Sequence, residues 1–135
     1  MKDLWLLSYQ LVAGFSDAST GALLIAAPLF TLRMMGLAVP ADATPFLSFI
    51  GAFVFAVGLA YLYGALLVRR TSGVPRLEAV WIMTAIIRSS VAIFIVASVL
   101  NRSLAPGWLT IAIFDGICAL IQARGLRQGW LHVVR

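Results

Sequence analysis

The stretch Trp81-Ile-Met-Thr-Ala-Ile-Ile-Arg88-Ser-Ser-Val-Ala-Ile-Phe-Ile-Val-Ala-Ser-Val-Leu100 is long and apolar enough to cross a lipid bilayer, yet its interior holds an arginine. A transmembrane helix needs about 20 predominantly apolar residues. A guanidinium near mid-membrane costs about 2.5–3.5 kcal/mol on insertion scales, and it cannot lose its charge. An anionic partner is therefore expected, and two other apolar runs each contain one carboxylate, Asp17 and Asp115.

The composition indicates a membrane protein. Hydrophobic residues make up 62% of the 135 residues and charged residues 11%, whereas about a quarter of the residues of soluble domains are charged. A soluble fold of this size could not bury so much apolar surface. We therefore interpret the net charge of +5 as a sign of membrane topology rather than of nucleic-acid binding.

Four apolar runs predict an all-α fold, an integral membrane antiparallel four-helix bundle. The chain is short enough for one transmembrane domain, residues 1–135, with spans at about 4–32, 45–68, 77–100 and 107–123 and a basic interfacial tail at 124–135. The first run is longer than a hydrocarbon core of about 30 Å requires, so it must tilt, kink at Pro28 or leave its first turns at the interface. It is also too long for the apolar core of a signal peptide, and we expect it in the mature protein.

The basic residues are distributed unequally about these spans. Seven lie on one side, and only Arg33 and Arg102 lie on the other. The positive-inside rule then places both termini in the cytoplasm, and we expect a bacterial cytoplasmic membrane. Four of the basic residues are predicted to contact lipid headgroups: Arg69, Arg70, Arg124 and Arg127. Four tryptophans near span ends are typical of an aromatic belt: Trp5, Trp81, Trp108 and Trp130.

Small residues recur every four positions in the first two spans, and such ridges let two helix backbones approach closely. The second span carries Ala52, Ala56, Ala60 and Gly64, and the first carries Gly14, Ala18, Ala22 and Ala26. We expect these two ridges to pack against each other.

The charged residues within the spans are predicted to meet. At about 1.5 Å per residue, Asp17, Arg88 and Asp115 all fall roughly 16–20 Å from the cytoplasmic end of their spans. With Thr20 and Gln122 from the same polar stripes they form a predicted intramembrane polar cluster. A short turn joins the third and fourth spans, which must then be adjacent, so we expect Asp115 to pair with Arg88. Asp17 is then the residue expected to take up a proton.

Two interpretations of this cluster stay open. It is either an ion pair that fixes the register of the helices or a site for a proton or a substrate.

The sequence offers no set of catalytic, metal-binding or cofactor-binding residues. It has one cysteine, Cys118, and one histidine, His132, and it lacks a phosphate-cradling glycine loop and a nucleophile–histidine–acid set. We therefore expect no cofactor and favour a non-enzymatic subunit or assembly partner of a larger membrane complex, or a homo-oligomer, in contact with membrane lipids. Two alternatives stay open: a small proton-coupled carrier of lipophilic ions, and a binder or modifier of an isoprenoid or quinone.

The predicted topology is tested by reporter fusions. A reporter fused after Arg135 and one inserted within residues 38–43 should lie on opposite sides of the membrane, because three predicted spans, an odd number, separate them. Activity of both reporters on the same side would contradict the topology.

Overall fold

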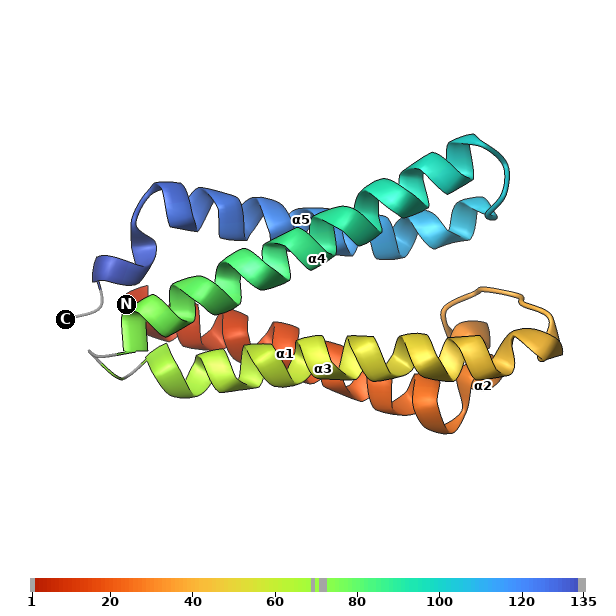
Figure 1. Ribbon diagram of the computed structural model, residues 1–135, viewed down its shortest axis with the longest axis horizontal. Coiled ribbons are helices and arrows are strands. Elements are labelled where there is room, and N and C mark those ends of the chain that lie inside the picture. The colour runs from red at the N-terminus through yellow and green to blue at the C-terminus, as the bar shows by residue number, and fades with distance from the viewer. Residues whose placement is uncertain (1, 69, 71–72, 134–135) are drawn as a thin grey trace. The chain divides into compact units, whose positions relative to one another are not determined.

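A computed structural model describes residues 2–68, 70 and 73–133, and among these residues there are helices and no strands (Figure 1). The α-helices of this part of the chain are α1 (Lys2–Ala26), α2 (Pro28–Met34), α3 (Thr44–Val68), α4 (Val74–Leu100) and α5 (Leu109–Arg127). Short 3-10 helices precede α3 and α5 and follow α5: η1 (Ala41–Ala43), η3 (Pro106–Trp108) and η4 (Trp130–Val133). The prediction of an all-α fold is confirmed.

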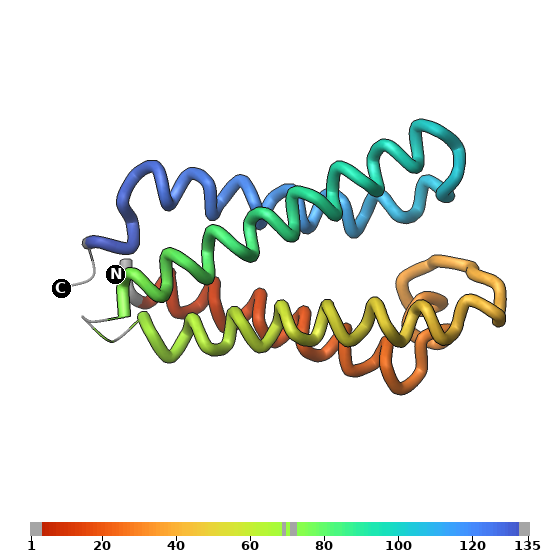
Figure 2. Tube along the Cα trace, viewed as in Figure 1, coloured from red at the N-terminus to blue at the C-terminus, as the bar shows by residue number. Residues whose placement is uncertain are grey.

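The chain divides into two compact units, Met1–Arg70 and Thr71–Arg135. In the first unit α1 and α3 run antiparallel and side by side, and α2 and a loop connect them along the chain (Figure 1). In the second unit α4 and α5 form an antiparallel pair joined by a short turn, and the two helices cross in the view of Figure 2. Each unit is thus a helical hairpin.

Three stretches within the described residues are long and apolar enough to cross a membrane: Ala41–Val68, Val74–Leu100 and Pro106–Arg127. They correspond to the second, third and fourth predicted spans. The first predicted span, 4–32, is not among them, because α1 carries several polar side chains, Gln10 and Asp17 among them.

The first predicted span is also divided. Proline disfavours helical geometry at the residue before it, and Ala27 leaves the helical region with φ −149° and ψ 65°. Pro28 then begins α2, where its missing N–H is not needed. α2 ends in a Schellman motif, in which Gly36 has φ 74° and the Leu37 N–H donates to the Leu32 carbonyl at 2.8 Å. Of the three alternatives for this run, the structure shows the one at Pro28, as a break between two helices.

The α1–α3 hairpin depends on close backbone contact through glycines. A Cβ atom added at Gly58 would lie 2.3 Å from the backbone nitrogen of Ala18, and one at Gly21 would lie 2.3 Å from that of Phe55. A Cβ at Gly14 would meet the Leu62 side chain at 2.9 Å. At Gly58 and Gly21 only hydrogen fits against the opposite backbone, so these two glycines set the separation of the two helices.

The predicted ridge on α3 needs a correction. Ala52 and Ala56 are exposed and Ala60 is half-buried, whereas Gly51, Gly58 and Gly64 of the same helix are buried. The small residues that meet α1 thus lie on a different face of α3 from the predicted ridge, and only Gly64 of that ridge belongs to the contact, where it lies against Gln10. On α1 the contact does use Gly14 and Ala18.

We predict that Gly58→Ala lowers the free energy of unfolding by about 1–3 kcal/mol, because the added methyl group meets backbone atoms that cannot move aside locally. The matched control is Gly116→Ala in α5, where an added Cβ meets nothing within 4 Å. Its stability should be unchanged or slightly higher, since alanine favours helix. Titration with a denaturing detergent, followed by circular dichroism, measures both. Equal stability of the two variants would show that the Gly58 contact is absent.

Candidate functional site

The second unit contains a buried ion pair between α4 and α5. Arg88 Nη1 donates to Asp115 Oδ1, and the two side chains are 3% and 12% exposed. The guanidinium carbon of Arg88 also lies 5.2 Å from the centroid of the Phe114 ring, within the range of a cation–π contact. The predicted pairing of Arg88 with Asp115 is confirmed. The contribution of Phe114 was not predicted, although its position next to the aspartate in the sequence was a usable signal.

Helix geometry explains why these residues meet. Arg88 lies one turn beyond Thr84 and two turns beyond Trp81 on the inner face of α4. Because α5 runs antiparallel to α4, residues spaced by one and two turns on α5 lie opposite these three residues of α4. Three contacts therefore follow one another along the hairpin. They are Arg88–Asp115, Thr84–Gln122 and Trp81–Gly125.

The middle contact is a chain of hydrogen bonds. The Thr84 hydroxyl donates to the Val80 carbonyl at 2.7 Å and accepts from Gln122 Nε2 at 2.6 Å. Gln122 is fully buried, and its Oε1 has no hydrogen-bond partner among the described residues. An unsatisfied buried acceptor costs about 1–3 kcal/mol. Thr84 and Gln122 therefore fix the helix register at an energetic cost rather than simply stabilising it.

The third contact closes the end of the hairpin. Trp81 is fully buried, and a Cβ at Gly125 would lie 2.5 Å from its ring and 2.8 Å from the ring of Trp130. Glycine opposite Trp81 lets its indole enter the core of the hairpin, while the predicted aromatic belt at the span ends stays a prediction. Trp5 is exposed, and Trp108 and Trp130 are half-buried.

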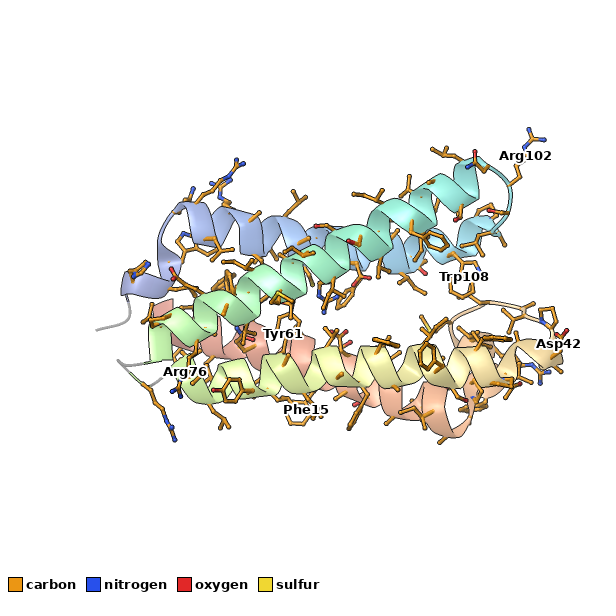
Figure 3. All side chains as sticks on the ribbon, viewed as in Figure 1. Phe15, Asp42, Tyr61, Arg76, Arg102 and Trp108 are labelled. Carbon is orange, nitrogen blue, oxygen red and sulfur yellow. The ribbon has the colours of Figure 1, made fainter. Side chains whose placement is uncertain are left out.

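The other two members of the predicted cluster belong to the first unit. Asp17 is buried on α1 and Thr20 is half-buried one turn further along. The first unit also holds the fully buried Gln10, and the hydroxyl groups of Tyr9 and Tyr61 lie 3.4 Å apart. Tyr61 and the exposed Phe15 point to opposite sides of this hairpin (Figure 3). Both hairpins thus hold buried polar side chains.

The basic tail does not continue as a helix. α5 ends at Arg127, and Gly129 with φ 63° turns the chain back into η4. Leu131 is buried, and His132 Nε2 lies 2.7 Å from Glu78 Oε1 on α4. The end of the tail is therefore held against α4, and its location at the membrane interface stays a prediction.

The arginines predicted to contact lipid headgroups are exposed, as far as the structure describes them. Arg124, Arg127 and Arg70 are exposed, and Arg69 lies outside the described residues.

The chemistry available to this arrangement is limited. Within the described part of the chain no three His, Cys, Asp or Glu side chains are grouped so as to hold a metal ion. Arg88 and Asp115 are hydrogen-bonded to each other, and the other buried polar side chains of α4 and α5 are Thr84, Cys118 and Gln122. The geometry therefore favours a structural role for the pair.

No protein-family model matches the chain, and neither a curated protein nor a solved structure matches it.

We predict that Arg88→Leu destabilises the protein by about 3–5 kcal/mol, because it leaves the Asp115 carboxyl buried without its cation. The double variant Arg88→Leu/Asp115→Leu should be more stable than this single variant, since neither charge remains. Denaturing-detergent titration of the two variants beside the parent measures the difference. A double variant less stable than Arg88→Leu would contradict the ion-pair account.

Proposed function

We propose that this chain is a small integral membrane protein that crosses the bilayer four times and acts as a non-enzymatic subunit of a larger membrane assembly. Three stretches have the required length and apolarity. The proposal that α1 also crosses rests on its contact with α3. This contact extends from Tyr9 opposite Tyr61 to Ile25, whose carbonyl accepts a hydrogen bond from Ser48 at 3.3 Å. A helix paired along this length with a transmembrane helix must accompany it through the bilayer.

The surface of the helices supports a lipid environment. Large apolar side chains are exposed on α1, α3, α4 and α5, for example Val12 at 69%, Phe46 at 73%, Ile93 at 69% and Leu120 at 72%. In water such a surface would drive aggregation. In a bilayer these side chains face acyl chains, and the buried polar side chains are held on the inner faces of the hairpins.

The ends of the second hairpin support the proposed orientation. Arg76 at the start of α4 lies at the same end of this hairpin as Arg124 and Arg127 at the end of α5. Arg102 is the only charged residue in the turn at the other end. We propose that the arginine-rich end faces the cytoplasm of a bacterial cell, which places both termini there, and that its arginines contact anionic headgroups.

The observation that carries the subunit proposal is the unused ridge on α3. Ala52 and Ala56 are exposed instead of packing against α1. Beside them, the exposed rings of Phe49 and Phe53 form an edge-to-face pair with centroids 4.9 Å apart. Small residues next to a fixed aromatic pair offer hollows and projections to another transmembrane helix. We propose that a helix of a partner subunit, or of a second copy, packs on this face.

The proposal is tested by native mass spectrometry after extraction in lipid nanodiscs. The parent protein should retain a protein partner or a second copy, and Ala56→Leu should lose it, because the larger side chain fills the hollow. Ala22→Leu is the matched control, since Ala22 is exposed on α1 of the same unit. A parent protein that carries lipid alone, or a complex that survives Ala56→Leu, would contradict the proposal.

A further inference from the structure

The second hairpin has an apolar groove beyond its ion pair. The groove lies between α4 and α5 on the side of the connecting turn, has a volume of about 440 Å³ and is open to the surroundings. Its lining includes Ala92, Val96, Ala97 and Leu100 of α4, and Ala112 and Gly116 of α5. Ala92 lies one helical turn from Arg88, so the groove ends close to the charged pair. These residues offer carbon surface alone apart from their backbone, and such a surface does not hold ordered water.

Gly116 is an anomaly that the hairpin itself does not explain. A glycine inside a helix costs about 0.8–1.0 kcal/mol relative to alanine. The other glycines inside α1, α3 and α5 are in close contact with a neighbouring helix or ring, where a Cβ would meet atoms at 2.9 Å or less. A Cβ at Gly116 would meet nothing within 4 Å. The absence of a side chain here keeps the groove open rather than letting two helices approach.

A cation follows the last groove residue of α4 in the sequence. Leu100 is the last residue of α4, and Arg102 follows in the turn, where it projects away from the helix end (Figure 3). Arg102 occupies the left-handed position of a Schellman motif with φ 59°, and the Ser103 N–H donates to the Ser98 carbonyl at 2.9 Å. Glycine or asparagine suits this position, and a left-handed conformation costs other residues roughly 1–2 kcal/mol.

We propose that the groove binds one acyl chain of an anionic phospholipid whose phosphate contacts Arg102. The groove extends over the nine residues from Ala92 to Leu100, about 12 Å of helix, which is close to the roughly 15 Å depth of one leaflet. An added helix of that length, about 10 Å across, would occupy roughly twice the volume of the groove. A single chain fits between the walls, and the Arg88–Asp115 pair limits how far it enters.

The charge distribution selects the headgroup. Arg102 is the only charged residue in the sequence between Arg88 and Asp115, so this end of the second hairpin itself offers an anion one cation and no carboxylate. Arg102 makes no ion pair within the described ranges 2–68, 70 and 73–133. A lipid phosphate at this position therefore gains a charge-assisted hydrogen bond from Arg102. The acyl chain of the same lipid covers the apolar surface of the groove. This inference goes beyond the proposed subunit role and shares with it only the membrane location.

The test is native mass spectrometry of the full chain in mild detergent, titrated with phosphatidylglycerol or with phosphatidylcholine of the same acyl chains. The parent should bind one phosphatidylglycerol at least fivefold more tightly than one phosphatidylcholine. Gly116→Leu should weaken both lipids at least fivefold, because its side chain fills the groove. Ala123→Leu, at an exposed position of α5 outside the groove, is the matched control and should bind like the parent.

A second variant separates the headgroup from the chain. Arg102→Asn suits the left-handed backbone and should fold like the parent, yet it should lose the preference for phosphatidylglycerol while still binding one lipid. Equal binding of the two lipids by the parent, or unchanged binding by Gly116→Leu, would overturn the inference. A dimer that Gly116→Leu dissociates would also overturn it, since a second copy would then occupy the groove. Loss of lipid binding with retention of a protein partner would leave the subunit proposal standing, so the two failures are distinguishable.

Discussion

A charged pair inside an apolar hairpin is the constraint on which the second unit depends. Arg88 cannot release its proton, and Asp115 of α5 is the carboxylate that meets it within the hairpin. That contact fixes both the axial register and the relative rotation of α4 and α5. Apolar packing specifies these only weakly in lipid, because lipid chains are as apolar as leucine. The Thr84–Gln122 and Trp81–Gly125 contacts follow in the same register.

The first unit achieves a specific register by different means. No ion pair between α1 and α3 is found among its described residues, and glycines bring the two backbones into contact instead. Close backbone approach is as selective as a charge pair, because a shift of one residue replaces hydrogen by a side chain. The two units thus use charge complementarity and steric fit for the same purpose. Both leave large apolar side chains on the outside, where lipid or a partner helix is the suitable environment.

The sequence predicted the helices and the ion pair because both follow from strong local signals. Apolar runs identify spans, and a short turn between two of them forces Arg88 and Asp115 into proximity. It did not predict which small residues of α3 meet α1. The pattern of Ala52 with Ala56 is nearly equivalent to that of Gly51 with Gly58, and side-chain fit alone decides between the two pairs. The return of the tail onto α4 depends on Gly129 and on buried Leu131, whose effect no periodic pattern reveals.

The central claim is that Arg88 and Asp115 are paired when the protein is reconstituted into lipid bilayers. Solid-state NMR in lipid bilayers measures it directly, through the dipolar coupling between ¹⁵N-labelled arginine side chains and the ¹³C-labelled aspartate carboxyl carbon. The resonance of Asp115 is assigned by its loss in Asp115→Asn. The account predicts a coupling that corresponds to a nitrogen–carbon distance within about 4 Å, as hydrogen-bond contact requires. A carboxyl carbon of Asp115 without measurable coupling to any arginine side-chain nitrogen would contradict it.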